Sequence, residues 1–152
     1  NLYYLDANFP FWDGFALLPH RSHDDGKKLD LAFCYMDPAT GEAINGSPSW
    51  LGYGVYADPQ QGEQDQPAIC GQGGHWQYSI MQSLVPQWSK DAFELDQMRT
   101  KAMVELFAAQ PAITKMFIEP HLKARMRLSS PKIRYHGCQA ARHDDHLHVQ
   151  IR

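Results

Sequence analysis

The order of apolar and polar residues along this chain predicts a mixture of short strands and helices. Apolar runs rich in β-forming residues occupy 29–36 and 50–56, and a strand-like alternation closes the chain at 146–152. Residues 112–118 predict a further short strand or an extended link. The segment 57–74 is rich in Gln, Pro, Gly and Asp, which is typical of a surface loop.

The most regular helical pattern covers residues 89–109. Ser89 is a suitable N-cap, and Pro111 ends the pattern. A second, shorter helix is expected to begin at Pro120. Because strands and helices show no regular βαβ alternation, the sequence predicts an α+β fold with a mainly antiparallel sheet and a long helix. The apolar residues at helical spacing in that long helix are Leu95, Met98, Ala102 and Leu106, with Met103 and Phe107 widening the stripe.

Length and charge narrow the classes of protein to consider. A chain of 152 residues suggests one domain spanning 1–152. Its net charge of −3 argues against a partner such as nucleic acid, which normally requires a basic face. No apolar run approaches the roughly 20 residues of a membrane-spanning helix. The cysteines, Cys34, Cys70 and Cys138, are compatible with one disulfide and one thiol or with three thiols.

The final ten residues, HDDHLHVQIR, contain the densest group of ionisable side chains. Side chains two apart in a strand point to the same face, so His146 and His148 project together while Leu147 and Val149 face the core. Histidine-rich tracts also bind metals nonspecifically, so this spacing alone does not establish a site.

A second cluster near the N-terminus supplies the missing partners. His23 precedes a turn containing Gly26, and Asp30 lies early in the strand that follows. A catalytic zinc ion takes three protein ligands from His and carboxylate side chains and keeps one position for water. Together the two clusters provide such a set on the sheet. The lone histidines His75, His121 and His136 are instead expected to be solvated or hydrogen-bonded in the core.

These residues also carry a family resemblance. The spacing His23-x-x-Gly26-x-x-x-Asp30, followed by His146-x-His148, resembles that of the zinc peptidases that include lysostaphin-type enzymes, D-Ala-D-Ala carboxypeptidases and dipeptidases. The closest resemblance is to the penicillin-insensitive murein endopeptidases, which have a segment similar to HDDHLHV. The likeness also covers 113–126, where that family has a strand, a proline and a lysine-bearing helix.

The resemblance implies a role for each residue of the two motifs. Zn²⁺ would be held by His23, Asp30 and His148. The catalytic group would be His146, as base or transition-state stabiliser, with His143 as an additional active-site histidine. Asp145 is an alternative base.

The function implied is a zinc-dependent peptidase that hydrolyses peptide cross-links or stem peptides of bacterial peptidoglycan. It would be a murein endopeptidase or a D,D-/L,D-peptidase in the periplasm or outside the cell. The first alternative is an inactive zinc-binding module that recognises a cell-wall or protein ligand. The second is an interaction domain with a histidine-rich end and no zinc. The sequence does not indicate an oligomeric state.

Aromatic residues around the 57–74 loop suggest where a substrate would lie. If this loop borders the cleft, the aromatics could stack on substrate, although large aromatics usually belong to the core. The four residues concerned are Trp50, Tyr53, Tyr56 and Trp76.

Overall fold

A five-stranded sheet occupies the centre of the computed structural model, which describes residues 2–7 and 25–152. Its strand order is β1-β2-β8-β6-β7, and all neighbours are antiparallel except β6 and β7. A small second sheet has the order β4-β3-β5. The predicted mixed fold with mainly antiparallel pairing is confirmed. The strands are β1 Tyr4–Ala7, β2 Lys28–Ala32, β3 Tyr35–Met36, β4 Ala43–Ile44, β5 Glu94–Leu95, β6 Ile113–Phe117, β7 Ile133–Arg134 and β8 His146–Ile151.

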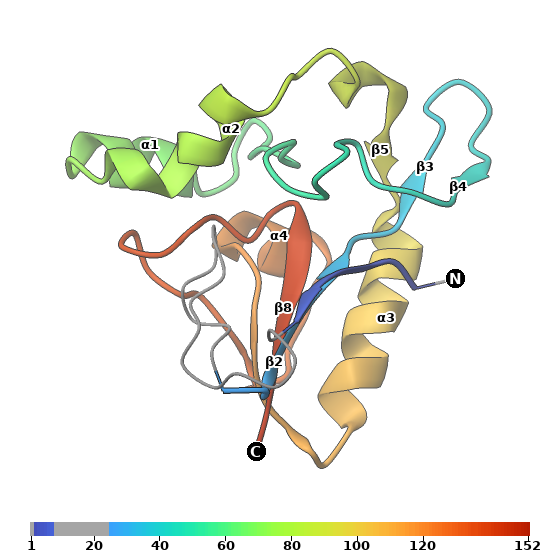
Figure 1. The fold of residues 1–152 in the computed structure, drawn as a ribbon, viewed down its shortest axis with the longest axis vertical. Coiled ribbons are helices and arrows are strands. Elements are labelled where there is room, and N and C mark those ends of the chain that lie inside the picture. Colours follow the sequence, from blue (N-terminus) through green and yellow to red (C-terminus); the bar gives the residue numbers. More distant parts are fainter. Residues whose placement is uncertain (1, 8–24) are drawn as a thin grey trace.

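Four α-helices accompany these strands in the described part of the chain. Figure 1 shows α3 running alongside the sheet, and α1 and α2 together across one end of it. None of the described helices is long and apolar enough to cross a membrane. The helices are α1 Gln66–Gln72, α2 Ile80–Leu84, α3 Gln97–Ala109 and α4 Pro120–Arg125, with short 3₁₀ turns at Trp76–Ser79 and Lys90–Ala92.

Strand β8 lies in the middle of the sheet and separates the core from the histidine-bearing face. Leu147 and Val149 belong to the hydrophobic core, together with Met103 and Val104 of α3. His146 and His148 point to the opposite face and are also buried. The alternation predicted for the end of the chain is therefore confirmed, and it places both imidazoles on one side of the sheet.

Helix α3 is shorter than predicted. It has 13 residues and begins at Gln97, where the Asp96 side chain accepts a hydrogen bond from the Arg99 backbone N–H at 2.8 Å. The expected cap, Ser89, instead donates a hydrogen bond to the backbone carbonyl of Pro48. Leu95 lies in β5, which pairs with β3. Strand pairing and the aspartate cap together override the helical spacing upstream of residue 97.

The apolar stripe expected on this helix is correct for Met103 and Phe107, which pack in or against the core, and wrong for Met98 and Leu106. The side chains of Met98 and Leu106 are 83% and 61% exposed. The buried face carries Thr100, Met103 and Val104. The Thr100 hydroxyl accepts a hydrogen bond from the Cys34 backbone N–H at 3.1 Å, so a polar contact fixes the rotation of α3 against the sheet.

Two further segments differ from the expected structure. Residues 50–56 contain no strand, and the expected loop 57–74 contains helix α1. Asp65 caps α1 by accepting a hydrogen bond from the Ala68 backbone N–H at 2.9 Å, which is a local signal within a Gly- and Gln-rich stretch.

A disulfide joins Cys70 of α1 to Cys138, and Cys34 is a free thiol. The bond closes a loop of 68 residues and ties α1 to the segment between β7 and β8. Restricting a loop of this length in the unfolded chain stabilises a protein by about 2–4 kcal/mol.

We expect the double substitution Cys70→Ser/Cys138→Ser to lower the free energy of unfolding by about 2–4 kcal/mol. Urea unfolding followed by tryptophan fluorescence measures this loss. Cys34→Ser is the matched control and should unfold like the parent in both the presence and absence of reductant. Equal stability of the double variant and the parent would contradict the prediction.

Candidate active site

Two neighbouring strands bring one carboxylate and one imidazole into direct contact. Asp30 of β2 is paired in register with His148 of β8, 118 residues further along the chain. The Nδ1 atom of His148 lies 2.8 Å from Oδ1 of Asp30, and both side chains are buried. The contact is the one expected when two predicted ligands share a face of adjacent strands.

The second oxygen of Asp30 is also engaged. Tyr53 donates its hydroxyl hydrogen bond to Oδ2 at 3.0 Å, and the Nε2 atom of His146 lies 3.8 Å from the same oxygen. The Tyr53 ring packs edge-on against the His146 ring, with 5.0 Å between centroids. Burial and the charge on Asp30 raise the pKa of Tyr53, so this phenol stays a hydrogen-bond donor.

Asp145 orients His146. One oxygen of Asp145 contacts Nδ1 of His146, and the other accepts a hydrogen bond from the Gly54 backbone N–H at 2.6 Å. Burial lowers the pKa of His146, but the negative charges of Asp30 and Asp145 outweigh it, so the pKa is raised overall. The carboxylate therefore holds the imidazole in one tautomer, with hydrogen on Nδ1.

Gly54 has φ +85°, in the left-handed region that glycine tolerates. An added Cβ there would lie 2.8 Å from the Met81 carbonyl oxygen and 2.9 Å from the Val85 side chain. The backbone N–H that reaches Asp145 thus requires glycine at this position.

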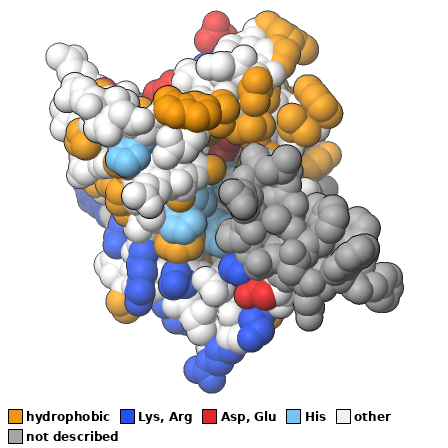
Figure 2. Space-filling model, turned by 60° about the vertical axis from the view of Figure 1, so that its left-hand side comes forward, with side chains coloured by type: hydrophobic (Ala, Val, Ile, Leu, Met, Phe, Trp, Pro, Cys, Tyr) orange, Lys and Arg blue, Asp and Glu red, His pale blue; other side chains and the backbone are white. Residues whose placement is uncertain are grey.

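Two more histidines complete an aromatic cluster beside the Asp30–His148 contact. The His143 ring lies 4.9 Å from the ring of His146 and 5.7 Å from that of His148, measured between centroids. His136 stacks on Phe117 at 4.0 Å and lies 5.3 Å from His143. Figure 2 shows histidine side chains gathered in a hollow on this face of the molecule.

His136 and Phe117 were not predicted to belong to the site. Phe117 is paired in register with both His148 and Arg134, and His136 follows Arg134 by two residues. Arg134 and His136 are two residues apart, so an extended strand would place both on one face of the sheet. The sequence contained little sign of this strand, because β7 is only two residues long. His136 is exposed, as expected of a solvated histidine, and its ring also stacks on Phe117 at the edge of the cluster.

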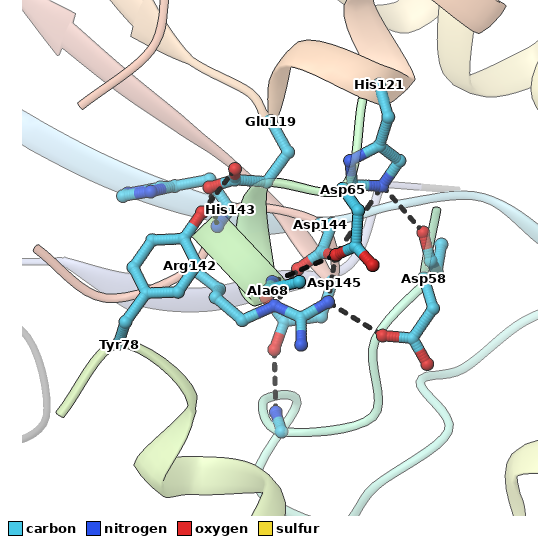
Figure 3. A network of polar contacts seen from close by, with 12 residues as sticks. Asp58, Asp65, Ala68, Tyr78, Glu119, His121, Arg142, His143, Asp144 and Asp145 are labelled. Atoms are coloured by element: carbon cyan, nitrogen blue, oxygen red, sulfur yellow. Dashed lines mark hydrogen bonds and ion pairs between the residues drawn. The ribbon is translucent and has the colours of Figure 1, made fainter. Parts of the chain in front are cut away.

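A buried ion-pair network supports the loop before β8. The Nε atom of Arg142 donates to Asp144 Oδ1 at 3.0 Å, and its Nη2 atom donates to Asp58 at 2.7 Å. Arg142 also lies over the Tyr56 ring at 3.9 Å, and His121 lies 3.6 Å from Asp144. Figure 3 shows Arg142 reaching between the two carboxylates. Asp144 therefore holds the loop, while its neighbour Asp145 faces the histidines.

Glu119 fixes the position of His143 from the other side. Its carboxylate accepts hydrogen bonds from the Tyr78 hydroxyl and from the His143 backbone N–H, the latter at 3.1 Å. Its own backbone N–H donates to the His143 carbonyl at 3.1 Å. Burial and the negative charge of Asp144 raise the pKa of Glu119 to about 7, although both hydrogen bonds oppose this shift. Figure 3 shows Tyr78 and His143 both reaching this carboxyl group.

We expect Glu119→Gln to flatten the dependence of stability on pH. The folded protein keeps the Glu119 proton up to about pH 7, whereas the unfolded chain loses it near pH 4.5. The free energy of unfolding of the parent therefore falls as pH rises through this window, by up to about 3 kcal/mol from this group. Glutamine mimics the protonated acid and removes the effect. Urea unfolding at several pH values from 4 to 8 tests this, and parallel curves for parent and variant would contradict it.

The predicted site residues are only partly covered by the described structure. Asp30, His143, Asp145, His146 and His148 lie together, whereas His23 falls outside the described residues. Among residues 2–7 and 25–152, no three His, Cys, Asp or Glu side chains form a group that could hold a metal ion.

The aromatic residues expected to border a cleft divide into two kinds. Trp50 and Trp76 are exposed, by 82% and 74%. Tyr53 and Tyr56 are buried and contact Asp30 and Arg142. Of these four aromatics, only the two tryptophans are exposed, and the two tyrosines support the site from within.

No protein-family model matches this chain, and no curated protein matches it either. The resemblance to murein endopeptidases stays a prediction that rests on the residues of the two motifs.

Proposed function

We propose that this protein is a zinc-dependent peptidase that hydrolyses peptide cross-links or stem peptides of bacterial peptidoglycan. The observation that carries the proposal is the contact between His148 Nδ1 and Asp30 Oδ1, with the His146–Asp145 pair beside it. Sequence positions more than a hundred residues apart supply an imidazole, a carboxylate and an oriented second imidazole on one face of the sheet. Such a combination has the donor types that catalytic zinc sites use.

The donor set is chemically suited to zinc. Asp30 and His148 present Oδ1 and Nδ1 to each other at 2.8 Å, and a bound cation would take the place of the hydrogen between them. Tyr53 holds the other oxygen of Asp30, as the supporting hydrogen bonds of metal ligands commonly do. His23 would be the third ligand. Zinc, when bound, supplies a Lewis acid that activates water and polarises a carbonyl group.

The protein's own groups would handle the protons. With hydrogen on Nδ1 held by Asp145, the basic atom of His146 is Nε2, which points toward Asp30 at 3.8 Å. From there His146 would accept a proton from water and pass it to the leaving amine. Both oxygens of Asp145 are engaged by His146 and Gly54, so we assign Asp145 the role of orienting the base. His143 would stabilise negative charge on the substrate oxygen.

The disulfide between Cys70 and Cys138 supports the location proposed. Disulfides persist in oxidising compartments and are rare in the cytosol. This bond would therefore form in a protein that is located in the periplasm or secreted.

The direct experiment is to incubate the protein, loaded with one equivalent of zinc, with purified muropeptide dimers and to analyse the products by mass spectrometry. We expect cleavage of a peptide bond that a chelator abolishes and added zinc restores. Stoichiometric zinc without any cleavage would instead favour the inactive zinc-binding module. Neither zinc binding nor cleavage would favour the interaction domain with a histidine-rich end.

A further inference from the structure

Basic side chains continue the face of the sheet that carries the histidine cluster. Lys28 of β2 and Lys115 of β6 are both paired in register with Gln150 of β8, two residues beyond His148. Arg134 of β7 is paired with Phe117, which is itself paired with His148. Paired residues share a face, as do residues two apart in one strand. Lys28, Lys115 and Arg134, which we call the basic row, therefore border the cluster.

Two members of the row are available to an anion. Lys115 and Arg134 form no ion pair with a carboxylate in the part of the chain that the structure describes. The Nζ atom of Lys115 lies 5.7 Å from the centre of the Phe117 ring, so the ammonium group leans toward the cluster. Lys28 differs, because it pairs with Asp25 at 2.9 Å.

The row contrasts with the charge of the whole chain, which is −3. Figure 2 shows Lys and Arg side chains gathered below the histidine-lined hollow, with hydrophobic side chains above it. Acidic residues on the same sheet face are Asp6 and Asp30, and Asp30 is engaged by His148 and Tyr53. The positive electrostatic potential of these Lys and Arg side chains attracts a negatively charged group of a molecule bound at the candidate site.

We propose that Lys115 and Arg134 form a subsite for a free carboxylate of the substrate peptide. This inference rests on the function proposed above and adds the part of the substrate that the protein recognises. Adjacent strands are about 4.8 Å apart and residues in a strand rise about 3.3 Å each, so the row lies roughly 7–10 Å from His148. An extended peptide covers that distance in two or three residues. The recognised carboxylate therefore lies two or three residues from the bond that is cut.

The test compares two forms of one cross-linked muropeptide dimer, with its carboxylates free or converted to primary amides. We expect the parent protein to have a KM about tenfold lower for the free-acid form, since a hydrogen bond to a charged group has about this effect. Lys115→Met and Arg134→Met should each remove most of this preference by raising KM for the free acid, with kcat and zinc content unchanged. Lys101→Met is the matched control, because Lys101 lies on α3, across the sheet from the site.

A binding measurement separates this inference from the proposed function. Isothermal titration calorimetry with a single uncleaved stem peptide, as free acid and as amide, needs no turnover and can be run with and without zinc. Tighter binding of the acid that disappears in Lys115→Met and Arg134→Met supports the subsite even if no bond is cut. Equal affinities of the two forms, or equal KM values in a protein that does cleave both, would overturn the subsite and leave the peptidase proposal standing.

Discussion

His146→Ala and His148→Ala are expected to differ in zinc binding, although both should lose hydrolytic activity. In the proposed site His148 holds the metal, so His148→Ala should lose both zinc and hydrolysis. His146 would move protons, so His146→Ala should keep near-stoichiometric zinc while hydrolysis falls by about 10²–10⁴-fold, the usual contribution of a general acid–base group. Zinc content by mass spectrometry and cleavage of muropeptides are measured on the same samples.

Both imidazoles are buried, so the folded state of each variant must be checked. Thermal unfolding and far-ultraviolet circular dichroism provide that check, and His75→Ala is a control at a histidine outside the cluster. If His146→Ala loses its metal as readily as His148→Ala, then His146 is a ligand and its assignment as base is wrong.

Arg142→Met should be among the most destabilising single substitutions in the chain. Asp144 is fully buried, and Arg142 supplies two of its contacts while also reaching Asp58. Removing one partner of a buried ion pair leaves the other charge unpaired at a cost of about 3–5 kcal/mol. Burial raises the pKa of Asp144 while Arg142 lowers it, so loss of the arginine would also raise that pKa further. Urea unfolding measures the loss of stability.

The double variant Arg142→Met/Asp144→Leu provides an internal check. Without either charge, the pair should cost less than the sum of the two single substitutions, because no unpaired charge remains. The exposed pair Lys101–Glu105, at 3.8 Å, is the matched control, and Lys101→Met should change stability by less than about 1 kcal/mol. A loss below about 1 kcal/mol for Arg142→Met would show that this network does not hold the loop.

Parts of the candidate site could be predicted because their signals are local. The alternation His146-Leu147-His148-Val149 places two imidazoles on one face and two apolar side chains in the core, whatever the partner strands are. A strand beginning near Asp30 was likewise visible in its β-forming residues. The helix before Pro111 was expected as well, but its start was not, since Asp96 and the pairing of β5 with β3 compete with the helical pattern.

The supporting residues depend on the tertiary structure. Asp145 meets the backbone of Gly54, 91 residues away, and Glu119 meets His143, 24 residues away. Neither contact produces a periodic pattern in the sequence. Each depends on a single backbone N–H or a single buried carboxyl group, and the path of the loops at the ends of the strands determines where these groups lie.

The chain's own order of residues thus determined which side chains share a face within each strand, since a period of two follows from backbone geometry alone. Only the folded chain decided which strands are neighbours, and so which imidazole meets which carboxylate. The register of β2 on β8 sets Asp30 against His148, and a shift of one residue would turn every side chain of β2 to the other face. Burial of Leu31 and Leu147 on the core side stabilises this register through many individually weak packing contacts.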